Sequence, residues 1–151
     1  MRQRTCSAAA VLTAVALLGL GVPTVAEART AEELNVCWVN KAPGAWLDLE
    51  VVADGPSFKT ASLDRGDCLA WDVQPGQYKL TLEDLDEFQN AMAAACGRGL
   101  ERRLKIFIKR QKDTYTTDFR ALRDNGGLQT TIRKDRRTTV TFVLTCVAVT
   151  T

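Results

Sequence analysis

Carboxylates are the side chains of this 151-residue chain that could do chemistry without a partner of another type. They stand in two groups: Asp48 with Glu50, and Glu83 with Asp84, Asp86 and Glu87. Two carboxylates can hydrolyse a glycoside, and a suitable acidic loop can bind Ca²⁺. The second group lacks the glycine-containing ligand loop of a calcium site, and its spacing fits helix capping. The chain contains no histidine, which excludes imidazole-activated nucleophiles and imidazole metal ligands. We therefore expect no catalytic activity, no cofactor and no metal site.

Four cysteines follow residue 28: Cys37, Cys68, Cys96 and Cys146. An even set of cysteines in a small exported protein predicts disulfides rather than free thiols. Three pairings are possible. We favour Cys37 with Cys68 and Cys96 with Cys146, because each bridge then closes one half of the chain. Each bridge should stabilise the fold by about 2–4 kcal/mol, mainly by restricting the unfolded chain.

The beginning of the chain has the pattern of an export signal. A short basic start precedes an apolar run over residues 8–20, and Ala26-Glu27-Ala28 fits a signal-peptidase cleavage site. The alternative is an uncleaved membrane anchor, which glycines and a proline near the end of the apolar stretch disfavour. We predict a secretory signal peptide over residues 1–28 and a single extracellular domain over residues 29–151 without a membrane span.

Short alternating runs bounded by turn residues dominate the rest of the chain. They cover residues 35–39, 46–52, 68–73, 77–83, 104–110, 114–119, 128–133 and 138–149. Such runs are typical of half-buried strands and predict an all-β fold, a small sandwich of about seven to eight strands. Asn125-Gly126-Gly127 and Lys134-Asp135-Arg136-Arg137 fit hairpin turns between the last three strands.

One segment has helical spacing instead. Asp84 lies three residues before Glu87, as in a capping box, and apolar residues then recur at helical intervals up to Cys96. Gly97 follows where a helix would end. We expect one inserted helix of about three turns that links the two halves of the sandwich.

Charge is distributed unevenly between those halves. Residues 29–96 carry five basic and twelve acidic side chains, a net charge of −7, whereas residues 97–151 carry thirteen and five, a net charge of +8. The halves could neutralise each other across adjacent strands, or the dipole could drive head-to-tail association. The sequence leaves open which of these holds.

Strand alternation places part of the positive charge on one surface. If Leu104, Ile106 and Ile108 face the core, their basic neighbours share the opposite face with Phe107. The candidate surface comprises Arg103, Lys105, Lys109, Arg133, Arg136 and Arg137. It predicts attachment through counterion release to an envelope polyanion such as a wall teichoic polymer, to an acidic polysaccharide or to extracellular nucleic acid, with no specific recognition of nucleic acid.

A second candidate surface follows from Trp46. In a strand it would share one face with Asp48 and Glu50, and this group could form a sugar platform or part of an interface with an extracellular protein. The simpler interpretation is a covered tryptophan with acids that serve solubility. Trp38 and Trp71 take apolar phases, and we assign both to the core.

Two resemblances add expectations about function. The Pro75-Gly76-Gln77-Tyr78 turn and the alternating strand after it resemble transthyretin-like and Cna-B-type sandwich domains of bacterial surface proteins, over residues 44–83. This resemblance implies a non-catalytic binding or adhesion role. The Lys–Asn isopeptide bond of such domains is not expected, because residues 138–149 contain no asparagine.

The second resemblance gives the alternative. Gly66-Asp67-Cys68-Leu69-Ala70 with Pro75-Gly76-Gln77 is similar to small two-disulfide inhibitors of hydrolases secreted by filamentous bacteria. It implies a protein that blocks an extracellular hydrolase with a rigid loop, for which residues 40–45 and 54–58 are candidates.

Overall fold

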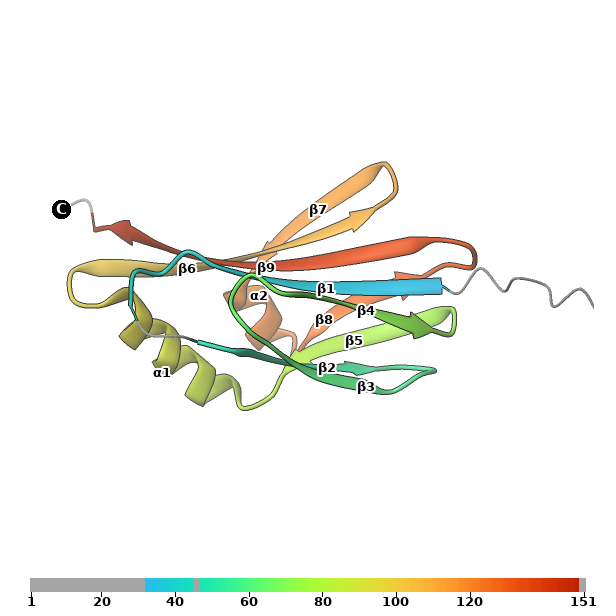
Figure 1. Ribbon diagram of the computed structural model, residues 1–151, viewed down its shortest axis with the longest axis horizontal. Helices are drawn as coiled ribbons and strands as arrows, with labels where there is room; N and C mark the ends of the chain where they lie inside the picture. The colour runs from blue at the N-terminus through green and yellow to red at the C-terminus, as the bar shows by residue number, and fades with distance from the viewer. Residues whose placement is uncertain (1–31, 45–46, 150–151) are drawn as a thin grey trace, which may run out of the picture.

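The computed structural model describes residues 32–44 and 47–149, so the predicted leader lies outside the described residues. Two sheets face each other (Figure 1). The large sheet has the order β4 (Cys68–Val73), β1 (Glu32–Asn40), β9 (Arg137–Ala148), β6 (Leu100–Arg110) and β7 (Asp113–Asp118). The small sheet has the order β3 (Lys59–Leu63), β2 (Leu49–Asp54), β5 (Gly76–Leu82) and β8 (Leu128–Ile132). The predicted class, a mainly β sandwich with an inserted helix and two disulfides, is confirmed.

The core lies between the sheets and follows the alternation of the strands. Leu104, Ile106 and Ile108 of β6 are buried as predicted, and so are Trp38 and Trp71. Strand β9 lies between β1, to which it is parallel, and β6, to which it is antiparallel. Its core-facing side chains Val140, Phe142 and Leu144 are fully buried, at the centre of the large sheet.

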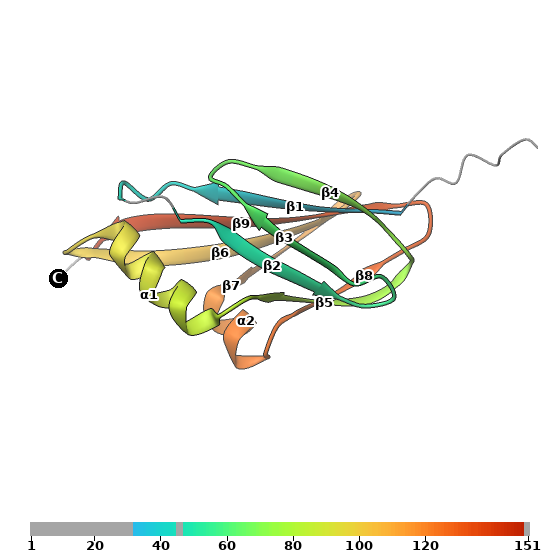
Figure 2. The ribbon, with the colours of Figure 1, turned by 60° about the horizontal axis from the view of Figure 1, so that its bottom comes forward.

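Two helices cover the part of the large sheet that the smaller sheet leaves open. Helix α1 (Leu85–Cys96) contacts β6 and β9, and helix α2 (Phe119–Asp124) contacts β6 and β7 (Figure 2). Phe88 of α1 lies between the aromatic rings of Trp38 and Phe119, with centroid distances of 5.9 and 6.4 Å. This row of rings joins both helices to the core. The expected helix is therefore confirmed as α1, and it links a strand of the small sheet to one of the large sheet.

Both favoured disulfides are present. Cys37–Cys68 joins the neighbouring strands β1 and β4, and Cys96–Cys146 joins the end of α1 to β9. The bridges enclose sequence separations of 31 and 50 residues. The second bridge fixes the helix on the sheet that it covers.

The two hairpins predicted near the C-terminal end are wrong. Strand β7 belongs to the large sheet, β8 to the small sheet and β9 to the large sheet, so both connections cross between the sheets. The first crossing contains α2, which the alternation did not predict; its N-cap, Asp118, accepts a hydrogen bond from the N–H of Ala121, and Leu122 is buried. Strand β3 was also not predicted. The strand expected at residues 46–52 is β2, and it begins at Leu49.

Candidate functional site

The predicted basic surface separates into two regions along β6. Arg103 and Lys105 lie near the beginning of this strand, and Lys109 lies near its end. Six residues of extended chain separate Arg103 from Lys109 by about 20 Å. Arg103 is paired with Glu101 at 3.1 Å, while Lys105 lies opposite Asp118 in the strand register. The first region therefore has acidic neighbours, and the concentrated positive charge lies at the other end of β6.

At that end four arginines line one small pocket of about 60 Å³, which we call the arginine pocket. Its arginines are Arg110, Arg133, Arg136 and Arg137, and its other lining residues are Gln111, Asp113, Tyr115, Thr131 and Thr138. The end of β6, the turn after β8 and the start of β9 meet here, at the right of Figure 1. The structure thus brings together three of the predicted residues and adds one that was not predicted.

The added residue, Arg110, has an unusual position. It continues the core-facing phase of Leu104, Ile106 and Ile108, so its side chain extends between the two sheets. Its Nη2 donates a hydrogen bond of 3.0 Å to the hydroxyl of Thr130, a buried residue of the small sheet. Its guanidinium carbon lies 5.4 Å from the ring centroid of Tyr115. These contacts fix the guanidinium at the open end of the sandwich.

The Nε of Arg110 is buried and has no hydrogen-bond partner among the described residues. A buried donor without an acceptor is uncommon in folded proteins, because the lost hydration costs about 1–3 kcal/mol. Asp113 faces Arg110 across the β6–β7 hairpin and lines the same pocket, but the two side chains form no ion pair within the described part of the chain. The pocket therefore retains hydrogen-bonding capacity for an anion.

A second, wider hollow adjoins the arginine pocket. It holds about 270 Å³ and is lined by Lys109 and Arg137 together with Asn35, Gln111 and Thr139. Arg137 and Gln111 line both hollows. Arg137 also forms an ion pair of 2.9 Å with Glu33 of β1. The predicted residues Lys109, Arg133, Arg136 and Arg137 thus form one continuous basic surface.

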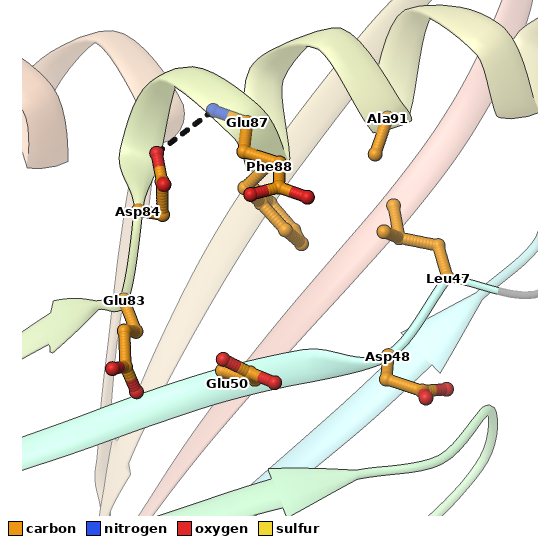
Figure 3. A pocket seen from close by; sticks show the side chains of 8 residues that line it. All are labelled: Leu47, Asp48, Glu50, Glu83, Asp84, Glu87, Phe88 and Ala91. Carbon is orange, nitrogen blue, oxygen red and sulfur yellow. Dashed lines mark hydrogen bonds between the residues drawn. The ribbon is translucent and has the colours of Figure 1, made fainter.

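The predicted acidic residues gather at another place, in a groove of about 220 Å³ between β2 and α1 (Figure 3). Its carboxylates are Asp48, Glu50, Glu83, Asp84 and Glu87, and its apolar lining is Leu47, Phe88 and Ala91. Figure 3 shows Asp84 at the start of the helix, where it accepts a hydrogen bond of 3.1 Å from the N–H of Glu87. Two of the acids therefore serve the helix N-terminus, where they offset its dipole.

The acidic groove shows no arrangement that points to chemistry. No group of three or more ligand-type side chains among the described residues could hold a metal ion. Asp48 and Glu50 are exposed, as expected, while Trp46 lies outside the described residues. The proposed tryptophan platform thus stays a prediction, and capping and solubility account for the acids that can be seen.

The acidic groove is formed by residues around β2, the end of β5 and α1, whereas the arginine pocket is formed by the β6–β7 hairpin, the turn after β8 and the start of β9, so the two clusters share no lining residue. The ion pair between Arg137 and Glu33 joins the acidic and basic halves of the chain. Two other ion pairs, Arg103–Glu101 and Arg123–Asp124, lie within the basic half. Among the described residues, one ion pair therefore joins the two halves, and no ion pair joins the acidic groove to the arginine pocket.

One of the two candidate loops is firmly braced. The hydroxyl of Tyr78 accepts a hydrogen bond from the N–H of Ser57 and donates one to the carbonyl of Gln74, at 3.0 and 2.8 Å. The N–H of Gln74 in turn donates to the hydroxyl of Ser57 at 3.0 Å. At the end of this loop, Phe58 is 65% exposed. The loop over residues 54–58 is thus a rigid support for one apolar side chain.

The other candidate loop packs against α1. Asn40 and Ala42 are buried, and the N–H of Gly44 donates to the carbonyl of Ala95 at 2.9 Å. A Cβ on Gly44 would lie 2.4 Å from that carbonyl oxygen, so a residue with a side chain does not fit at this position without a shift of the backbone. The described part of this loop, residues 40–44, serves the packing of the helix.

No protein-family model matches the chain, and no curated protein is similar to it. Among solved structures, the chain is similar to the major pilin from Streptococcus pyogenes, with 11% sequence identity and a TM-score of 0.34. Two mutants of the same pilin give 12% identity and a TM-score of 0.35. In each case the match covers 76% of this chain and 47% of the pilin chain, so the chain spans about half the length of the pilin. TM-scores this low carry no argument about function.

Among the described residues, no helix has the length and apolar character required to cross a membrane. Two disulfides fit the oxidising environment outside the cell. The sandwich architecture agrees with the resemblance of residues 44–83 to transthyretin-like and Cna-B-type domains.

Proposed function

We propose that this protein is a non-catalytic, extracellular binding protein that attaches to a polyanion of the cell envelope through the arginine pocket and Lys109. The convergence of Arg110, Arg133, Arg136 and Arg137 on one pocket supports this function. Asp113 lines the pocket with them and Glu33 forms an ion pair with Arg137, so the positive side chains outnumber these carboxylates. Two segments of the chain supply these arginines: Arg110 ends β6, and the other three lie within residues 133–137, so only the folded protein brings Arg110 to the others.

Counterion release gives such a surface its affinity. A polyanion carries condensed cations, and each arginine or lysine that contacts it releases some of them to the solution. Binding should therefore weaken as salt concentration rises, with a slope set by the number of contacts. The second charge cluster, the acidic groove, shares no lining residue with the arginine pocket, and moderate salt screens its repulsion of a bound polymer over distances beyond about 10 Å.

Co-sedimentation with isolated cell-envelope material, at low and at high salt, tests the proposal. The first variant replaces Lys109, Arg133 and Arg136 with glutamine. The matched control replaces Arg98, Arg102 and Arg103, which are exposed basic residues of the same half of the chain. Both variants lose three positive charges, so a difference between them reports position and not net charge.

We expect the native protein to bind at low salt and to be released by salt. The first variant should lose most of its binding, and its dependence of log affinity on log salt should become shallower by roughly 2–3 units. The control variant should bind nearly as the native protein does. Equal loss in both variants would show attraction by net charge alone and would contradict the proposed site.

The braced loop supports a second candidate function, inhibition of an extracellular hydrolase. A rigid loop loses little conformational entropy on binding, and an exposed aromatic side chain such as Phe58 can anchor an interface. The protein would then form a salt-tolerant, stoichiometric complex with one hydrolase. Titration of secreted proteases and glycosidases with the native protein and with Phe58→Ala checks this function, because only the native protein should inhibit.

A further inference from the structure

We infer that the arginine pocket is a site for a phosphate group, with the guanidinium of Arg110 as its central ligand. This inference rests on the proposed function and specifies which group of the polymer is recognised. The predicted basic residues Lys109, Arg133 and Arg136 are exposed, as charged residues usually are. Arg110 instead occupies a core-facing strand position between the sheets, where burial of a guanidinium costs free energy unless the group is paired and hydrogen-bonded.

The contacts of Arg110 leave part of its hydrogen-bonding capacity unused. Nη2 is satisfied by Thr130, and the ring of Tyr115 packs against the group. Nε is buried without an acceptor in the described part of the chain. Since no carboxylate pairs with Arg110 there, an anion in the pocket is the group that would neutralise its charge and accept from it after a small adjustment.

The distribution of donors favours phosphate over carboxylate. Arg110 comes from the end of β6, whereas Arg133 and Arg136 come from the turn between β8 and β9, and Arg137 begins β9. Four guanidinium groups from these two segments suit an anion with oxygens that point in several directions, as those of phosphate do. A carboxylate presents two oxygens in one plane and is matched by a single guanidinium.

The same pocket is poorly suited to nucleic acid. Proteins that bind single strands stack bases on exposed aromatic rings. The aromatic residue of the arginine pocket is Tyr115, and Arg110 lies over its ring. The pocket therefore offers one exposed ring and no row of rings for successive bases, which favours a phosphate-bearing envelope polymer.

Nuclear magnetic resonance tests the inference on the native protein, because the Nε–H groups of arginines give separate ¹H–¹⁵N signals. The probes are polyphosphate, polyglutamate of equal charge and oligothymidine. We expect polyphosphate to shift the Arg110 Nε–H signal in a saturable way and to bind about tenfold more tightly than polyglutamate. Arg110→Lys identifies the signal and keeps the charge.

The affinity of variants gives a second readout. Arg110→Lys should weaken polyphosphate binding by about tenfold, because lysine lacks the planar set of donors. The control Arg103→Lys, at an exposed ion pair, should change the affinity by less than about twofold. Thermal unfolding of each variant checks that the fold is retained, and the measurement on native protein does not depend on any variant.

The outcomes separate the two proposals. If the native protein binds neither polyphosphate nor envelope material at low salt, the proposed function fails and the phosphate site fails with it. If the protein binds but the Arg110 signal does not move, the proposed function stands and the site is wrong. Equal affinity for polyglutamate would also overturn the phosphate site, whereas tighter binding of oligothymidine, which carries phosphate groups too, would overturn the choice of an envelope polymer over nucleic acid.

Discussion

The hydroxyl of Tyr78 connects the loop over residues 54–58 to Gln74 through two hydrogen bonds. The side chain is fully buried, at 0% exposure, and its oxygen makes hydrogen bonds to Ser57 and Gln74 on opposite sides. Tyr78→Phe removes this oxygen and keeps the ring. It therefore tests whether the loop is braced by the hydroxyl or only by apolar packing.

The expected magnitude follows from the two lost hydrogen bonds. Each hydrogen bond contributes about 1 kcal/mol net to stability. A backbone N–H or C=O left without a partner and without water would increase the loss of stability. Gln74 is exposed and Ser57 is half-buried, so water can replace part of the interaction. We expect the free energy of unfolding to fall by about 2 kcal/mol, which corresponds to a Tm lower by roughly 6–10 °C for a domain of this size.

Urea denaturation and thermal unfolding measure this loss, and hydrogen exchange at the amide of Ser57 reports the loop itself. The matched control is Tyr115→Phe, because Tyr115 is 53% exposed and its hydroxyl makes no hydrogen bond with a described residue. The control should change stability by less than about 0.5 kcal/mol. A Tyr78 variant as stable as this control, with unchanged exchange at Ser57, would refute the bracing and remove the main support for an inhibitory loop.

Two further changes test the elements that position the helix. Asp84→Ala should lower stability by about 1 kcal/mol or more in urea denaturation, because it removes the N-cap acceptor and places alanine at a left-handed φ of 46°; Asp84→Asn should retain most of the stability. Replacing Cys96 and Cys146 together with alanine should cost about 4 kcal/mol, since a closed loop of 50 residues is released, and thermal unfolding in non-reducing buffer should show it. A loss below about 1 kcal/mol would contradict this entropic account.

The sequence predicts which residues face the core far better than it predicts which strands are neighbours. Alternation reports one buried face per strand, so Leu104, Ile106 and Ile108 could be assigned correctly. It carries no information about the sheet to which a strand belongs. The turns at residues 125–127 and 134–137 have hairpin-like composition, yet each leads to the opposite sheet. Pairing is decided by long-range packing, here by the insertion of β9 between β1 and β6.

The two elements that sequence analysis missed are short and lack a strong pattern. Strand β3 is an edge strand whose last residue, Leu63, is its buried position. Its pairing comes from β2 and not from a hydrophobic face of its own. Helix α2 has six residues, too few for a helical period to show. Its available signal was Asp118, whose side chain caps the N–H of Ala121.

The candidate site shows how alternation can be used to find function. Arg103, Lys105 and Lys109 occupy solvent-facing positions of β6. Charged side chains are common at such positions and therefore do not by themselves indicate a binding site. Arg110 follows in the core-facing phase, and this departure from the pattern could be seen in the sequence without any structure. Burying a guanidinium there costs free energy unless its donors are used. Arg102 shares this phase but is exposed, whereas Arg110 is partly buried, so phase and burial together single out Arg110, and the Arg110→Lys experiment tests this reasoning together with the phosphate site.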